Sequence, residues 1–203
     1  MPTAAVRVPQ GERTRLMRQR LLEATVECLV ESGWAGTSTT LVSQRAGVSR
    51  GAQLHHFPAK SDLVLAAVEH LAETRGQELR EAASRLPGGR RRTRAVLEML
   101  AAHFTGPVFT AALELWVAAR TDPALHSAVS DFEQRLGRET HRSTVELLGF
   151  DESRPGVREL VQATLDLVRG LGLASTIGDD VRRRGRILDQ WARTLDAAVA
   201  ERR

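Results

Sequence analysis

The order of apolar and polar residues along this 203-residue chain has the period of an α-helix throughout. Apolar residues recur at intervals of three and four, and no window sustains the period-2 alternation of β-branched residues that indicates a strand. Glycine and proline gather at a few breaks between the periodic segments. The pattern therefore predicts an all-α protein. The predicted helices cover residues 12–32, 38–46, 50–57, 60–86, 93–105, 108–120, 123–148 and 155–176, with a last one that starts at Asp179 or Asp180.

Residues 36–63, "GTSTTLVSQRAGVSRGAQLHHFPAKSDL", hold two unusually short predicted helices. Thr37 is placed to cap the first of them, and Ser49 is placed to cap the second. Gly47 suits the left-handed turn that ends a helix. Because Gly47 accepts a positive φ and Val48 can turn inward as a plug, the two helices are expected to cross at a steep angle.

This arrangement is typical of a helix-turn-helix, whose second helix enters a DNA major groove roughly 12 Å wide. A helix of two turns is long enough, because only its N-terminal half reaches the bases. The rival interpretation, a simple helical connector, leaves the caps, the glycine and the plug unexplained. The expected core of the unit consists of Leu21, Leu29, Val42, Ala46, Leu54 and Phe57.

The charge is distributed unevenly along the chain. Residues 1–60 contain eight basic and four acidic residues, which accounts for the whole net charge of +4. This asymmetry favours a polyanionic partner at one end of the molecule, although an excess of four also fits chance. A single cysteine, Cys28, cannot form an internal disulfide and fits a reducing cytoplasm. Without a secretory pattern or an apolar run near 20 residues, the chain is expected to be cytoplasmic, with no membrane partner.

Three groups of residues carry a resemblance to a known family. They are "LLEATVECLVESGW" in the first helix, "TS…V…AGVS" in the second helix and turn, and "G…HHFPAKSDL" in the third helix and the start of the fourth. At this spacing residues 12–70 resemble the DNA-binding domain of the tetracycline-repressor (TetR) family. The resemblance implies a basic arm (1–11), a homeodomain-like helix-turn-helix domain (12–60), and a helical-bundle domain for ligand binding and dimerisation (61–203).

Contacts with a double-stranded DNA operator can be proposed position by position. Arg50 could read guanine or hold a phosphate, and Gln53 has the side chain for bidentate contact with adenine. Lys60 matches the family lysine that meets phosphate. Family members often carry leucine at position 53 and tyrosine at position 54, so the usual tyrosine is absent and Leu54 is expected in the core. The full set of expected DNA-binding residues is Thr37, Ser38, Ser49, Arg50, Gln53, His55, His56 and Lys60.

Two further features lie in the N-terminal part of the chain. Arg7, Arg13 or Arg15 could lie against phosphate or in the minor groove, while a disordered tail serves equally well for residues 1–10. The pair of histidines does not indicate a metal site, because adjacent positions on a helix point about 100° apart. We expect no metal and no cofactor.

The C-terminal residues are expected to bind a small, apolar inducer and a second copy of the chain. The resemblance identifies no ligand. It places the dimer interface on the last two long helices, although packing inside one subunit is a serious competitor. The candidate ligand-binding residues are Met99, His103, Phe104, Phe109, Trp116, His126, Phe132 and His141, with Glu114 as a further polar anchor. The candidate dimer residues are Leu167, Leu171, Leu173, Trp191 and Leu195, beside Gly170 and Gly172, which would permit close approach.

The sequence therefore predicts a homodimeric transcriptional regulator, a repressor that a ligand releases from a palindromic operator. The alternative is a helical ligand-binding or enzymatic protein without a DNA role. An enzyme is disfavoured because no serine occupies a nucleophile elbow and the six histidines lack metal-ligand spacing.

Overall fold

The structure is a computed structural model that describes residues 9–178 and 181–200. Over those residues the chain forms nine α-helices and one short 3-10 helix, with no strand, which confirms the all-α prediction. The helices are α1 (Gln10–Gly36), α2 (Thr39–Ala46), α3 (Arg50–His56), α4 (Lys60–Ala83), η1 (Gly89–Arg91), α5 (Arg92–Phe104), α6 (Pro107–Ala119), α7 (Pro123–Leu148), α8 (Val157–Ser175) and α9 (Val181–Ala200).

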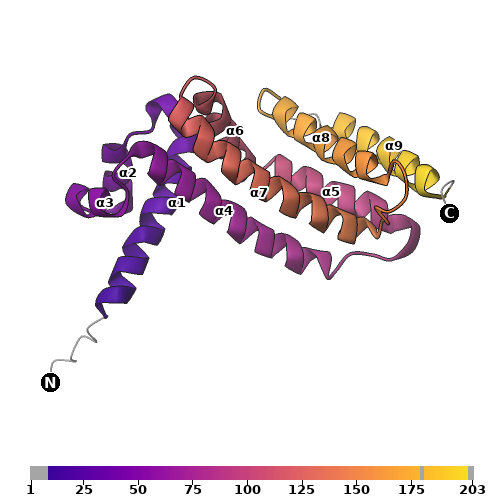
Figure 1. Ribbon diagram of the computed structural model, residues 1–203, viewed down its shortest axis with the longest axis horizontal. Coiled ribbons are helices and arrows are strands. Elements are labelled where there is room, and N and C mark those ends of the chain that lie inside the picture. The colour runs from indigo at the N-terminus through magenta and orange to yellow at the C-terminus, as the bar shows by residue number, and fades with distance from the viewer. Residues whose placement is uncertain (1–8, 179–180, 201–203) are drawn as a thin grey trace.

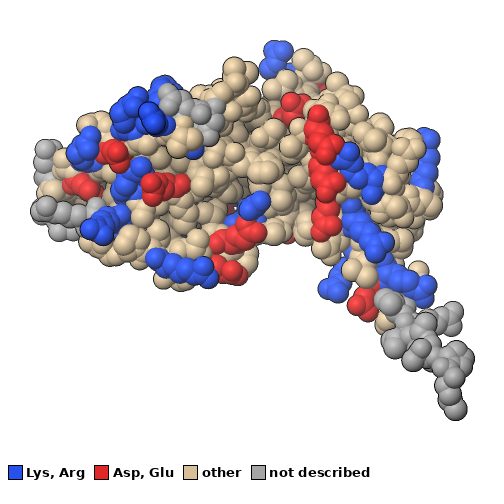
Figure 2. All heavy atoms as spheres, turned by 180° about the vertical axis from the view of Figure 1, so that it is seen from behind, with Lys and Arg blue, Asp and Glu red and all other residues tan. Residues whose placement is uncertain are grey.

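The first three helices form a compact unit at one end of the molecule, and the N-terminal part of α1 projects from it (Figure 1). Its core is a cluster of buried side chains from α1 to α4, namely Leu21, Leu22, Ala24, Cys28, Val42, Val48, Phe57, Leu63 and Ala67. On the face shown in Figure 2, Lys and Arg side chains gather at the end that carries the projecting part of α1, and a band of acidic side chains lies beside them.

The remaining helices form an elongated bundle in which α4, α5 and α7 run along its length and α8 and α9 lie together on one side (Figure 1). One core cluster joins α1 to the bundle and contains Leu29, Val64, Val68, Ala72, Ala111, Ala112, Leu115, Ala119, Leu125, Val129 and Phe132. A second lies among α5, α8 and α9 and includes Val96, Leu97, Leu100, Phe104, Val161, Leu165, Val168, Leu188 and Leu195. Helix α4 contributes to the core of both parts, so a boundary at residue 60 remains a prediction.

The helix ends follow local chemistry closely. Asp122 caps α7, since its Oδ1 accepts hydrogen bonds from the amides of Ala124 and Leu125 at 3.1 Å. Gly149 ends the same helix in the left-handed conformation. The differences from prediction are small: α1 starts at Gln10, α4 ends at Ala83, and α8 begins at Val157. The predicted start of the last helix at Asp179 or Asp180 lies outside the described residues, as does Arg7 of the basic arm.

Within the described part of the chain, no single helix is long and apolar enough to span a membrane. Helices α5 and α6 together reach the length and apolar character that a membrane span requires, but the chain bends by 54° between them.

Candidate DNA-binding surface and ligand cavity

Helices α2 and α3 are held in a fixed arrangement by their caps and by the turn between them. Ser38 caps α2, since its Oγ accepts a hydrogen bond from the Leu41 amide at 3.1 Å. Gly47 has a φ of 63°, and the Val48 amide donates to the Ser43 carbonyl at 3.0 Å. Val48 is buried, as expected of a plug. Ser49 then caps α3, whose orientation is therefore set by the turn and by the core beneath it.

The outward face of α3 carries Arg50, Leu54 and His55, all of which are exposed. Leu54 is 45% exposed, so the expectation that it belongs to the core is wrong. Gln53 is 0% exposed, and its Nε2 donates to the carbonyl of Phe57 at 2.7 Å. Since adjacent helical positions differ by about 100°, burying Gln53 turns Leu54 outward. The prediction that Gln53 contacts adenine does not fit this structure, because the side chain points into the subunit.

The other predicted contacts divide by exposure. Thr37 is buried and its Oγ1 donates to the Gly33 carbonyl at 2.8 Å, so it neither caps α2 nor faces DNA. Ser38 and Ser49 are exposed, but their hydroxyls serve as helix caps. His56 is half-buried, with its ring centroid 5.6 Å from that of His55. Over the residues described, no group of three or more His, Cys, Asp or Glu side chains could hold a metal ion.

Lys60 is the first residue of α4, and its side chain turns back toward α1. Its Nζ donates to the carbonyl of Trp34 at 2.5 Å and lies 4.2 Å from the centroid of the Trp34 ring. Burial lowers the pKa of Lys60 from its usual value. The ammonium group is therefore engaged by α1 in this structure, whereas the resemblance implied that it would meet a phosphate.

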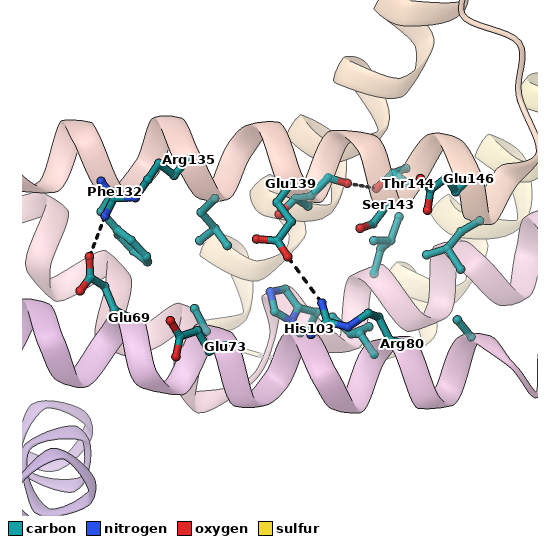
Figure 3. A pocket seen from close by; sticks show the side chains of 18 of the residues that line it. Glu69, Glu73, Arg80, His103, Phe132, Arg135, Glu139, Ser143, Thr144 and Glu146 are labelled. Atoms are coloured by element: carbon teal, nitrogen blue, oxygen red, sulfur yellow. Dashed lines mark hydrogen bonds and ion pairs between the residues drawn. The ribbon is translucent and has the colours of Figure 1, made fainter. Parts of the chain in front are cut away.

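A cavity of about 680 Å³ lies between α4 and α7, and α5 also contributes to its lining (Figure 3). Its apolar lining consists of Ala72, Leu79, Ala83, Leu100, Phe132, Leu136 and Leu147, and its charged lining of Glu69, Glu73, Arg80, Arg92, Arg135, Glu139 and Glu146. Two ion pairs cross between the helices, one from Arg135 to Glu69 at 2.8 Å and one from Arg80 to Glu139 at 3.5 Å. The cavity therefore has both apolar and charged side chains in its lining.

His103 reaches the cavity from α5. Burial, together with the nearby positive charge of Arg75, lowers the pKa of its imidazole. The shift favours the neutral ring, which can both donate and accept a hydrogen bond.

Comparison with known proteins agrees with this geometry. Residues 21–67 match the model of the bacterial regulatory proteins of the tetR family. The chain is 33% identical over 184 residues to the HTH-type transcriptional regulator CymR of Pseudomonas putida, an alignment that covers 88% of each protein. The chain belongs to the TetR family.

Solved structures give the same fold. A transcriptional regulator from Pseudomonas aeruginosa PAO1 superposes with a TM-score of 0.70 and 27% identity over 97% of both chains. A regulator from Saccharomonospora viridis, crystallised in complex with choline, superposes with a TM-score of 0.68 and 18% identity, covering 90% of this chain and 96% of that one. TetR-family proteins are DNA-binding transcriptional regulators and not enzymes, so the alternative of a helical ligand-binding or enzymatic protein without a DNA role is wrong.

The structure of this TetR-family chain brings only two of the predicted ligand residues, His103 and Phe132, to the cavity. Phe104, Phe109 and Trp116 instead stack edge to face inside the bundle, with ring centroids 5.7 and 5.8 Å apart. Aromatic pairs in this geometry contribute stability beyond the area that they bury.

The polar ligand candidates are placed elsewhere as well. His141 pairs with Glu152 at 2.5 Å, and His126 is exposed on α7. Met99 is half-buried on α5 but does not line the cavity. Glu114 accepts a hydrogen bond from the backbone amide of Trp34 at 2.7 Å. These four residues are therefore not part of the cavity.

The lining that the sequence interpretation missed has a helical signature of its own. Glu69, Glu73, Gly76 and Arg80 follow one another at intervals of three and four along α4. Such a stripe usually indicates a solvated face, which is why it was not recognised.

The predicted dimer residues differ in burial. Leu195 and Leu171 are buried within the subunit, and Leu167 packs against the same core. Trp191 is half-buried, with its Nε1 donating to Thr164 Oγ1 at 2.9 Å. Leu173 is exposed. The competing explanation, packing inside one subunit, therefore accounts for Leu171 and Leu195, and Leu173 stays a prediction for the interface.

Proposed function

We propose that this regulator is a homodimeric repressor that binds a palindromic operator and is released by a small amphipathic molecule held between α4 and α7. The observation that supports DNA reading most directly is the outward face of α3. Arg50 can donate two hydrogen bonds to guanine or hold a phosphate, His55 can donate to either, and Leu54 can pack on a thymine methyl group.

Arginines on the first helix support contacts with the DNA backbone. Arg15, Arg18 and Arg20 are exposed on the N-terminal half of α1, and the Arg18 guanidinium lies 5.4 Å from the centroid of the Phe57 ring. Lying beside the duplex, they would neutralise phosphates and release counterions, so binding should weaken steeply with salt.

Apolar side chains near the junction of α8 and α9 support dimerisation. Leu173, Ile177 and Val181 are all exposed, and Ile177 is 95% exposed. Isolated exposed apolar residues are common, but three within nine positions give a second copy apolar side chains to cover. The dimer would then place its two α3 helices one DNA turn apart, about 34–36 Å.

The shape and chemistry of the cavity favour an amphipathic ligand over the wholly apolar one expected from the sequence. A volume of about 680 Å³ suits a small molecule. The apolar lining can bury a hydrocarbon portion. Four of the seven charged side chains form ion pairs with one another, and the other three, together with His103, can bind a polar group of the ligand. The same fold holds choline in the Saccharomonospora viridis protein. A ligand releases DNA only to the extent that it prefers a different separation of the two α3 helices.

The experiment that tests this proposal is a titration of the purified chain against the DNA flanking its own coding region, with a shuffled duplex of equal composition as control. Both are measured at two salt concentrations. We expect tight binding to the natural duplex, a preference of at least about 10³ over the shuffled one, and steep weakening with salt. Equal affinity for the two duplexes at both salt concentrations contradicts the proposal.

A further inference from the structure

Three helices from the two parts of the molecule meet at the backbone of Trp34. The helical conformation of α1 is interrupted at Gly33, which has φ 64° and ψ −176°. The Trp34 amide donates to Glu114 Oε2 on α6 at 2.7 Å. The Trp34 carbonyl accepts from Lys60 Nζ at the start of α4 at 2.5 Å. Both backbone polar groups of this residue are thus bound by side chains of other helices.

Gly33 makes the approach of Glu114 possible. Its positive φ is rarely adopted by residues with a side chain, and a Cβ placed there would lie 2.8 Å from Glu114 Oε2. The glycine therefore serves two purposes, since it redirects the chain and leaves room for the carboxylate. An ordinary interruption of a helix does not need room for a carboxylate from another helix.

Both partners of Trp34 belong to helices that also reach the cavity or its walls. Helix α4 runs unbroken from Lys60 to the cavity residue Glu69, a distance of about 14 Å at 1.5 Å per residue. Helix α6 is tied to α7 through Trp116, whose Nε1 donates to Glu133 Oε1 at 2.7 Å. A displacement of α4 relative to α7 must therefore change the relative positions of Lys60 and Glu114. Their hydrogen bonds to the backbone of Trp34 would change as a result.

We infer that Lys60 and Glu114 form a clasp on Trp34 that fixes the orientation of the DNA-binding unit on the bundle, with Lys60 as a positioning residue. The inference deepens the proposed function and rests on it, because it assigns Lys60 a part in coupling the cavity to α3. The side chain's two contacts, a carbonyl oxygen and an aromatic face, hold it on α1. The competing role is a direct phosphate contact.

The salt dependence of DNA binding separates the two roles. Each neutralised phosphate contributes about 0.9 to the slope of log affinity against log salt. Removing a phosphate contact lowers that slope, whereas loosening the clasp lowers the affinity by the same factor at every salt concentration. Glu114 provides the matched control, since both Glu114→Ala and Glu114→Gln remove its charge but only the glutamine keeps an oxygen that can accept from Trp34.

The experiment compares the full chain with its Lys60→Met, Glu114→Ala and Glu114→Gln variants on the natural flanking duplex over a range of NaCl concentrations. We expect Lys60→Met and Glu114→Ala to weaken binding about fivefold or more with an unchanged slope, and Glu114→Gln to bind like the unaltered chain. A slope reduced by about 0.9 in Lys60→Met, with normal binding by Glu114→Ala, identifies Lys60 as a phosphate contact and overturns the inference.

Amide hydrogen exchange at Trp34 without DNA gives a readout that is independent of operator binding. Exchange should be faster in Glu114→Ala and Lys60→Met than in Glu114→Gln, with circular dichroism showing that each variant is folded. Equal exchange in all three variants refutes the clasp. If the unaltered chain does not distinguish the natural duplex from the shuffled one, the proposed function fails while this comparison still decides whether the clasp exists.

Discussion

Replacing Gly172 by alanine tests the packing of α8 against α5. A Cβ at this position would lie 2.2 Å from the carbonyl oxygen of Phe104 and 3.0 Å from its carbonyl carbon. A third atom, Phe109 Cε1, would lie 3.0 Å away and belongs to a side chain, but the two atoms of Phe104 are backbone and cannot rotate away, so the two helices must move apart. Gly170 lies on the same helix, and a Cβ added there would have no neighbouring atom within 4 Å, which makes Gly170→Ala the natural control.

The comparison isolates the cost of the clash. Both substitutions gain roughly 1 kcal/mol of helix propensity, so this gain cancels between them. A contact of 2.2 Å falls more than about 1 Å short of van der Waals separation, and overpacking of this kind costs about 1–3 kcal/mol. Gly172→Ala should therefore be less stable than Gly170→Ala by about 1–3 kcal/mol.

Equilibrium urea unfolding followed by far-ultraviolet circular dichroism measures this difference. Each variant is studied at two protein concentrations, because the proposed dimerisation would make the apparent stability depend on concentration. Equal free energies of unfolding for the two variants refute the packing described here. A penalty at Gly172 that vanishes on dilution would place the glycine at the dimer interface instead.

Three further substitutions test individual residues. Gln53→Ala should lower the free energy of unfolding by about 2–4 kcal/mol in urea titrations, because it opens a space and leaves the carbonyl of Phe57 without its donor. If the variant has normal stability but a changed base preference, Gln53 contacts the DNA major groove instead. Leu54→Ala should weaken binding at one base pair of each half-site in a scan of operator variants, and an unchanged profile would exclude a thymine contact. Burial raises the pKa of Glu133, despite the hydrogen bond from Trp116, so the folded chain holds this proton more tightly than the unfolded chain. The native chain should therefore lose stability relative to Glu133→Gln as the pH rises above about 4.5, and a parallel pH dependence of the two in thermal unfolding would contradict this.

Local chemistry made most of the fold predictable. Asp122 followed by proline, Gly47 in a left-handed turn and Val48 as a plug each satisfy a requirement of a few neighbouring residues. Such requirements are visible in the sequence because the residues that meet them are adjacent in it. The same reasoning found Ser49 as the cap of α3.

The orientation of α3 was harder to predict because the helix has only seven residues. Fewer than two full turns give no clear apolar stripe. Hydrophobicity alone therefore placed Leu54, and not Gln53, in the predicted core. In the structure, the amide of Gln53 is buried by bonding to Phe57 at the helix end, and Leu54 is exposed in its place. The burial of Gln53 is only partly compensated, because its Nε2 has an acceptor whereas its Oε1 has no hydrogen-bond partner among the described residues. Hydrogen bonding of this kind cannot be read from hydrophobicity alone.

The position of the cavity could not be read from the sequence, because it depends on the distance between helices. Its α4 wall contains Ala72, Gly76 and Ala83, small residues that leave space when α7 lies opposite. Large aromatic residues such as Phe104 and Phe109 were expected to line a ligand site because of their chemistry, but in the structure they pack against each other in the core. A cavity forms where side chains of facing helices do not touch, and no sequence motif marks such positions.

The most direct test of the central claim, that α3 lies in the major groove of a DNA half-site, is cleavage by an iron chelate attached to this helix. Burial raises the pKa of Cys28, the single cysteine, so its thiol should stay unreactive while a cysteine introduced by His55→Cys is labelled. The label at position 55 should cut the natural flanking duplex at two centres one helical turn apart, about 10–10.5 base pairs. A label introduced by Ser84→Cys, at the exposed far end of α4, should not cut it. Cleavage from position 84, or none from position 55 on fully bound DNA, would contradict the account.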